Sequence, residues 1–245
     1  MSGAPSGRFA GRTCLITGAT GGIGRAVLER WLADGGSAWA TDVTEPLLSH
    51  PGVVSRALDV TDPTSWSRLI AEVESSNASI DTLLLCHGVS QPHVPTAEVD
   101  LVDWNRVLEI NLTGCFLGIQ ATLPPMVERG FGRVVAVASI AAKEASAGEH
   151  VYAASKAGLV ALIKSVGKEV ATTGVTLNSV APGPVETPLW DALSDSLKAD
   201  RLRRTPMARP ARPEEVASIT LWLASEEASY TTAQVFDASG GRATY

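Results

Sequence analysis

The chain has 245 residues, a length that suits one large α/β domain or two small domains. Its 45% hydrophobic and 19% charged residues are typical of a globular protein and exclude wholesale disorder. With 20 Lys and Arg against 26 Asp and Glu, the formal net charge is -6, which disfavours nucleic acid and anionic membranes as partners.

The cysteines and the apolar runs indicate the cellular compartment of the protein. Cys14, Cys86 and Cys115 are far apart and odd in number, so they predict neither a disulfide framework nor a metal site and favour a reducing compartment. Residues Met1 to Arg12 lack the apolar core of a signal peptide, and no apolar run reaches the length of a membrane span. We expect a soluble, cytoplasmic protein without a bound metal.

Short apolar, β-branched runs alternate with helical patterns along nearly the whole chain. Strands are expected at Thr13–Thr17, Ser37–Asp42, Val53–Leu58, Asp81–Cys86, Arg133–Ser139, Thr176–Ala181 and Gln234–Asp237. Helices are expected at Ile23–Ala33, Pro63–Ser75, Trp104–Arg129, Val151–Thr172 and Pro213–Ala224. This alternation predicts an α/β fold, a single-domain Rossmann-type doubly wound parallel sheet of about seven strands with helices on both faces, over residues 1–245.

One segment interrupts the alternation. From Pro182 to Arg212 the chain is rich in proline, arginine and leucine, with a short helical pattern at Leu189–Leu202. Such an insertion is either a lid over a site or a mobile surface loop. Because it follows the C-terminal end of a strand, where α/β sheets bind ligands, we favour a substrate lid at about residues 184–212.

A glycine-rich turn joins the first strand to the first helix. Gly18, Gly22 and Gly24 allow a tight turn and a close approach of backbone N–H groups to a pyrophosphate at the helix N-terminus. The spacing differs from the usual G-x-G-x-x-G, and the turn lacks the lysine of a P-loop. A loop can also gather glycines only to turn tightly, but at this junction nucleotide binding is favoured.

Asp42 ends the second strand, and a carboxylate there can accept hydrogen bonds from the adenosine ribose hydroxyls and repel a 2′-phosphate. NAD is therefore favoured over NADP. In the alternative interpretation, Asp42 only caps the turn before Thr44.

The second half of the chain carries a catalytic pattern. Tyr152 and Lys156 are four residues apart on one face of a helical pattern, and Ser139 ends the preceding strand. A free tyrosine, with a pKa of about 10, is a poor base at neutral pH, but a neighbouring ammonium favours the phenolate. Ser139 can hold a substrate oxygen while Tyr152 takes or gives its proton. Separately, the three residues could be a strand-end cap, a half-buried aromatic and a solvated lysine.

Together these motifs resemble the classical short-chain dehydrogenase/reductase family over essentially the whole chain. The resemblance is carried by Thr17 to Gly24, Asp59-Val60, Asn111-Leu112-Thr113-Gly114, Ser139, Tyr152, Lys156 and Pro182 to Thr187. It implies a proton relay in which Lys156 assists Tyr152 and binds the nicotinamide ribose, while Asn111 distorts its helix and keeps a water that links Lys156 to solvent. The cofactor-binding residues that it implies are Gly18, Gly22, Ile23, Gly24, Asp42, Asp59, Val60, Gly88, Tyr152, Lys156, Val185 and Thr187.

The chain departs from the family after the fourth strand. The family's N-N-A-G aligns with Leu85-Cys86-His87-Gly88, so the asparagines that brace neighbouring strands are missing, and the brace must be rebuilt or lost. Cys86 is interpreted as a small buried filler rather than a reactive thiol. His87 is expected to pack or form hydrogen bonds rather than to catalyse.

Residues after Ser139 and on the insertion are candidates for substrate contact. Glu144 and His150 could line the pocket or lie on the surface, and Trp190 could close over a ligand. Lys143 or Arg242 could pair with a substrate carboxylate, or each could be a solvated surface charge.

The sequence and the resemblance together predict an NAD-dependent oxidoreductase that interconverts a secondary alcohol and a ketone. The C-terminal Phe236 to Tyr245 resembles the tails of family members that act on sugar acids and hydroxy acids. The alternatives are a 3-oxoacyl-thioester (acyl-carrier-protein) reductase and a non-catalytic NAD(H)-binding sensor, which would not need the four relay residues. The resemblance also implies a homotetramer with a small-molecule substrate and contacts between the Trp104–Arg129 and Val151–Thr172 helices.

Overall fold

A computed structural model describes residues 7–46 and 48–245, so Met1 to Ser6 of the segment examined for a signal peptide lie outside it. All seven strands form one parallel sheet in the order β3-β2-β1-β4-β5-β6-β7. The strands are β1 Thr13–Thr17, β2 Ser37–Asp42, β3 Val53–Ala57, β4 Thr82–Leu85, β5 Gly132–Val137, β6 Val175–Pro182 and β7 Val235–Ala238. The predicted α/β, doubly wound fold is confirmed.

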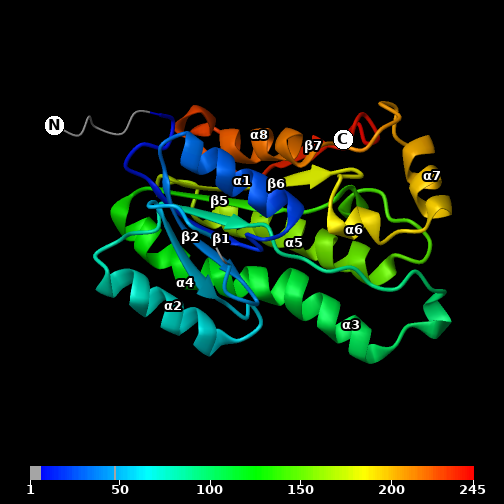
Figure 1. Cartoon of the computed structure of the whole chain (residues 1–245), viewed down its shortest axis with the longest axis horizontal. Coiled ribbons are helices and arrows are strands. Elements are labelled where there is room, and N and C mark those ends of the chain that lie inside the picture. Colours follow the sequence, from blue (N-terminus) through cyan, green and yellow to red (C-terminus); the bar gives the residue numbers. More distant parts are fainter. Residues whose placement is uncertain (1–6, 47) are drawn as a thin grey trace.

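Helices cover both faces of the sheet (Figure 1). One face carries α1 (Gly22–Ala33) and α8 (Pro213–Ala224), and the other carries α2 (Pro63–Ser75), α4 (Gly114–Arg129) and α5 (His150–Glu169). The shorter helices are α3 (Leu101–Leu108), α6 (Pro188–Asp191) and α7 (Asp195–Arg203). Within residues 7–46 and 48–245, no helix is long and apolar enough to cross a membrane.

Two apolar layers hold the helices to the sheet. On the α1 and α8 face, Trp31 is fully buried and stacks on Phe9 with ring centroids 3.9 Å apart. On the opposite face, Trp66 and Met126 pack with Leu159 of α5. Aromatic rings of this size bury about 150–250 Å² each, so they dominate the contacts between helices and sheet.

The sheet register brings the ends of three strands to one place. Thr17 at the end of β1 pairs with Thr41 of β2 on one side and with Leu85 of β4 on the other. The chain leaves β1 toward β2 and β3 and later returns on the other side through β4, so strand order reverses here. In doubly wound sheets, ligands bind in the crevice at such a reversal.

Two predicted helices differ from the observed ones. The expected Trp104–Arg129 helix begins earlier, at Leu101, and is interrupted by a π-helical turn, η2 (Glu109–Thr113). The single pattern at Leu189–Leu202 is two helices, because the Ser194 hydroxyl accepts a hydrogen bond from Leu197 N and starts α7 separately from α6.

Candidate active site

Three glycines of the glycine-rich turn are packed too closely to carry a side chain. Gly18 has φ +66°, and a Cβ there would lie 2.8 Å from His87 Cα. A Cβ on Gly24 would lie 2.1 Å from the Gly18 carbonyl oxygen, and one on Gly22 would lie 2.7 Å from Thr187 Cγ2. The turn therefore contacts the backbone just after β4 and the Thr187 side chain of the segment 184–212.

Asp42 lies at the rim of a groove beside this turn. Its Oδ2 accepts hydrogen bonds from Thr20 N (3.1 Å) and Thr20 Oγ1 (2.5 Å), and its Oδ1 accepts one from Val43 N (2.8 Å). Asp59 also faces the groove, and its Oδ1 accepts hydrogen bonds from Thr61. The groove is lined by Gly18, Thr20, Gly21, Thr41, Asp42, Val43, Leu58, Asp59, Val60, Cys86, His87, Gly88, Val89 and Ile110.

A second cavity continues from this groove, and both are lined by Cys86, His87 and Gly88. Among the site residues expected from the sequence, this cavity is also lined by Ile23, Ser139, Tyr152, Lys156, Val185 and Thr187. Asn111, the other expected relay residue, is buried and does not line it. A dinucleotide fits the pair of sites, since glycine backbone and a carboxylate line one and a hydroxyl, a phenol and an ammonium line the other.

Lys156 is the buried charge at the centre of the site. Its side chain comes from α5, is 3% exposed, and donates a hydrogen bond from Nζ to the Val137 carbonyl oxygen at 2.9 Å. The ammonium lies 5.9 Å from the centre of the Tyr152 ring. A Cβ on Gly88 would lie 3.2 Å from Lys156 Nζ, so glycine leaves the ammonium open to the groove.

The Ser139 hydroxyl can donate its hydrogen to a ligand in the cavity. Its Oγ accepts a hydrogen bond from Ala141 N at 3.1 Å, which caps the short helix η3 (Ile140–Ala142). The cap occupies a lone pair and leaves the hydroxyl hydrogen for a ligand in the cavity. The capping role and the substrate-binding role considered for Ser139 are thus compatible.

Asn111 lies in the π-helical turn, and the helix distortion that the family resemblance implies is present. Its Nδ2 donates to Val89 O (2.9 Å) and Ser155 Oγ (3.0 Å), and its Oδ1 accepts from Val89 N (2.8 Å). Asn111 therefore joins the loop after β4 to α5, one residue before Lys156. Such π-bulges are frequent at functional sites.

His87 replaces the missing brace. The ring Nδ1 lies 2.6 Å from Thr17 Oγ1 at the end of β1, and Nε2 lies 3.1 Å from the Ile110 carbonyl oxygen in the π-helical turn. Burial, together with the positive charge of Lys156, lowers the pKa of His87 to about 4. A neutral imidazole with Nε2–H donating to Ile110 would accept the Thr17 hydroxyl at Nδ1.

The two cysteines beside His87 have raised thiol pKa values. Burial raises the pKa of the Cys86 thiol and that of the Cys115 thiol to about 12 each. A thiol must ionise to act as a nucleophile, so Cys86 behaves as the expected packing residue.

Gln91 is a positioning residue that sequence reasoning did not identify. Its Oε1 accepts a hydrogen bond from Tyr152 N at 2.8 Å, and its Nε2 donates to the Gly148 carbonyl oxygen at 3.1 Å. It thereby fixes the first turn of α5, where Tyr152 lies. A lone glutamine in a loop has no spacing that could have revealed this role.

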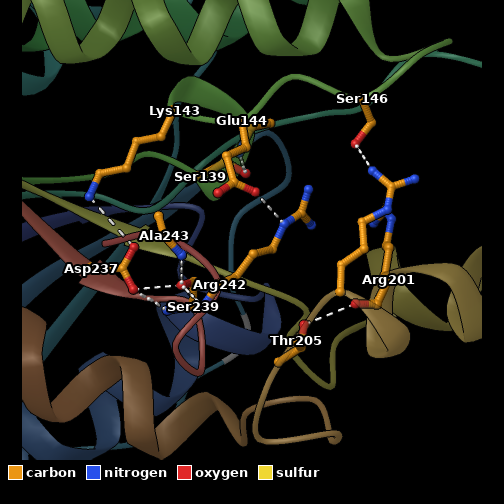
Figure 2. Close-up of polar contacts among 12 residues, drawn as sticks. Ser139, Lys143, Glu144, Ser146, Arg201, Thr205, Asp237, Ser239, Arg242 and Ala243 are labelled. Carbon is orange, nitrogen blue, oxygen red and sulfur yellow. Dashed lines mark hydrogen bonds and ion pairs between the residues drawn. The ribbon is translucent and has the colours of Figure 1, made fainter. Parts of the chain in front are cut away.

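The outer wall of the cavity is charged, and only part of it was expected. Glu144 and Trp190 line the cavity as predicted, together with Leu189, Leu193, Glu149, Arg201 and Arg242. His150 is not among the lining residues, because the preceding Glu149 turns inward and forms an ion pair with Arg201 of α7. Arg242 is not a solvated charge; its Nε donates to Glu144 Oε2 at 3.0 Å (Figure 2).

Comparisons with known proteins agree with this geometry. The family model described as Enoyl-(Acyl carrier protein) reductase matches residues 18–243. The chain is 37% identical to the 2-dehydro-3-deoxy-L-rhamnonate dehydrogenase (NAD(+)) of Sphingomonas sp. (strain SKA58), covering 98% of both chains. It is 34% identical to the 3-oxoacyl-[acyl-carrier-protein] reductase FabG of Salmonella typhimurium, covering 95% of this chain and 98% of that protein.

A solved structure is similar over the same length. The 3-oxoacyl-[acyl-carrier protein] reductase with bound NAD from Brucella melitensis superposes with a TM-score of 0.85 at 30% identity, covering 98% of this chain and 95% of that one. The chain belongs to the short-chain dehydrogenase/reductase family and is an oxidoreductase that acts on CH–OH groups.

The roles of Tyr152 and His87 can be separated by substitution. Tyr152→Phe removes the hydroxyl that we expect to donate and accept the proton, so kcat should fall by about 10²–10⁴-fold. His87→Ala removes two hydrogen bonds but no reacting group, so most of the turnover should remain. Steady-state rates at saturating cofactor measure both. A His87→Ala variant as inactive as Tyr152→Phe, yet folded by circular dichroism, would make the histidine catalytic.

The low pKa of His87 predicts a pH dependence of stability. Below a pH of about 6.5 the unfolded chain binds a proton at this histidine, whereas the native chain does so only near the value of about 4. Stability therefore falls as the pH falls through this window, by up to about 3 kcal/mol from this group. Urea unfolding of wild type and His87→Ala between these pH values should show the stability difference shrinking toward acid; parallel curves would contradict the assignment.

Proposed function

We propose that the protein is an NAD-dependent dehydrogenase that interconverts a secondary alcohol and a ketone in a hydroxy acid or sugar acid. The observation that carries this proposal is the meeting of Ser139, Tyr152 and Lys156 in one cavity that continues into the groove of Asp42. A nicotinamide dinucleotide bound there would accept or supply the hydride. A binding-only sensor would have no need of this arrangement.

The chain's own residues would handle the proton. Ser139 Oγ–H donates to the substrate oxygen, since Ala141 N already occupies a lone pair of that hydroxyl. During oxidation the Tyr152 hydroxyl, as phenolate, takes the alcohol proton, and during reduction it returns one to the developing alkoxide. The nearby Lys156 ammonium stabilises the phenolate form by charge.

Asn111 supports the passage of protons away from this pair. The distorted helix at Asn111 and the glycine at position 88 leave space beside Lys156 Nζ. We propose that a water there links the ammonium to solvent. Within the described chain, Lys156 has no carboxylate within 4 Å, so it is free to bind the ribose hydroxyls of a cofactor.

Asp42 supports NAD as the cofactor. Its carboxylate lies at the groove rim beside Thr20, where a 2′-phosphate would meet negative charge, and the groove lining holds no Lys or Arg. The Sphingomonas relative that is 37% identical is named as an NAD(+) dehydrogenase, which agrees with this choice of cofactor.

A second candidate is a 3-oxoacyl-thioester reductase. It is favoured by the 34% identity to the Salmonella 3-oxoacyl-[acyl-carrier-protein] reductase. The segment 184–212 is proposed as the lid for either substrate, since Leu189 and Trp190 line the cavity. Assembly into a homotetramer stays a prediction.

The Asp42 carboxylate should determine the choice of cofactor. Wild type is expected to prefer NAD over NADP by about 100-fold in kcat/KM, and Asp42→Ala should reduce this ratio by at least about tenfold because the repulsion is lost. Thr20→Val is the matched control, since it removes the hydroxyl bonded to Asp42 and keeps the charge. Equal ratios in wild type and Asp42→Ala would reject the assignment.

The substrate class can be tested with a panel followed by NADH absorbance. Hydroxy acids and aldonates with NAD should be oxidised faster than neutral secondary alcohols, and Tyr152→Phe gives the background rate. Reduction of a 3-oxoacyl thioester with NADPH as the main activity would replace this proposal with the second candidate. If the protein binds NADH but turns over no substrate of the panel, the non-catalytic NAD(H)-binding sensor would be the remaining interpretation.

A further inference from the structure

We propose that Arg242, three residues before Tyr245, binds the carboxylate of the substrate and so selects acids over neutral alcohols. The inference rests on the proposed function, because it names what the cavity wall binds while Ser139 and Tyr152 hold the reacting oxygen. Both ends of such a substrate would lie in one cavity, since these three residues all line it.

Arg242 combines deep burial with unused donors. Its side chain is only 6% exposed, and its one hydrogen bond to another side chain uses Nε, on Glu144. Across residues 7–46 and 48–245, neither Nη1 nor Nη2 of Arg242 has a protein hydrogen-bond partner. Because Arg242 lines the cavity, this pair of nitrogens can bind a carboxylate through two parallel bonds.

The C-terminal tail, Phe236 to Tyr245, holds the Arg242 side chain in place. Ser239 Oγ accepts hydrogen bonds from Arg242 N (3.0 Å) and Ala243 N (3.2 Å) and donates to Asp237 Oδ1 (2.6 Å), as Figure 2 shows. Gly240 and Gly241 have φ +69° and +86°, which turns the chain back toward the cavity. The guanidinium is thus pre-organised, which lowers the entropy lost on binding.

Lys143, the other cation considered for this role, is engaged elsewhere. Its Nζ lies 3.5 Å from Asp237 Oδ2 and also donates to the Tyr245 carbonyl oxygen, while the Tyr245 hydroxyl donates to Lys143 O at 2.7 Å. Lys143 does not line the cavity. Its contacts fasten the tail to the loop after Ser139 and leave Arg242 as the cation that faces the substrate.

Arg201 is less suited than Arg242. Its side chain is 26% exposed, and it forms an ion pair with the more buried Glu149, which ties α7 to the start of α5. Glu144, by contrast, is 36% exposed, so it stays hydrated when Arg242 shares its charge with a second carboxylate. The Arg201–Glu149 ion pair is therefore part of the cavity wall, whereas Arg242 of the Arg242–Glu144 pair can also bind a ligand.

The charge of the cavity suits an acid. Three cations line it, Lys156, Arg201 and Arg242, against two anions, Glu144 and Glu149, although the whole chain has a net charge of -6. One substrate carboxylate would balance the cavity. An apolar acyl chain laid against the Arg242–Glu144 pair would strip water from it without replacing the lost hydrogen bonds, which is unfavourable.

The test is calorimetric titration of the full-length protein saturated with NADH, using gluconate against gluconamide and lactate against lactamide. Wild type should bind an acid better than its amide. Arg242→Gln should weaken acid binding by about 30-fold or more and change amide binding by less than about threefold, and Arg242→Lys should restore part of the loss. Unchanged NADH affinity shows that each variant is folded.

Arg201→Gln is the competing variant. The proposal is overturned if Arg201→Gln loses acid binding while Arg242→Gln keeps it, or if wild type binds acid and amide equally. Parallel assays with NAD separate this inference from the proposed function: acid binding that depends on Arg242 without turnover supports the carboxylate site and rejects the dehydrogenase.

Discussion

The site depends on a buried ammonium that the protein does not neutralise. Lys156 Nζ donates one hydrogen bond, to the Val137 carbonyl oxygen, and no carboxylate of the described chain lies within 4 Å of this nitrogen. An isolated buried charge costs several kcal/mol, so it persists only where the surroundings leave it no other conformation. The groups around it are kept neutral: His87 has a pKa of about 4, and the Cys86 thiol one of about 12. The charge is thus available to a phenolate or to a ligand.

Close backbone packing places this ammonium beside the cofactor groove. Gly18 lies against the backbone of His87, so the residues that follow the paired strands β1 and β4 are in contact, and Gly88 lies next to Lys156 Nζ. His87 then ties the same β1 end to the π-helical turn that holds Asn111. One junction therefore brings the groove, the lysine and the asparagine next to one another.

The fold was predictable because hydrophobic periodicity and turn chemistry act locally. The strands and most helices begin within a few residues of their predicted positions, and the motif from Thr17 to Gly24 lies where a nucleotide turn belongs. The break at Asn111 came from family resemblance rather than periodicity. Gln91 and Arg201 could not be found, because their roles arise from contacts 61 and 52 residues away in the chain. His150, which the sequence left open as a pocket or a surface residue, does not line the cavity, whereas the neighbouring Glu149 does.

Arg242 shows why composition misjudged the cavity. A terminal arginine in an acidic chain has solvated surface charge as its ordinary interpretation, and nothing in spacing contradicts that. Burial reverses the interpretation, because the tail is fastened at Ser239 and Lys143 and its side chain must follow. The same fastening makes the last residues part of the wall that surrounds Ser139. Substrate specificity in this protein would then be determined by the loop after β5 and the tail after β7 together. Ser139 belongs to the same loop, so the proposed specificity and the proposed chemistry share one wall of the cavity.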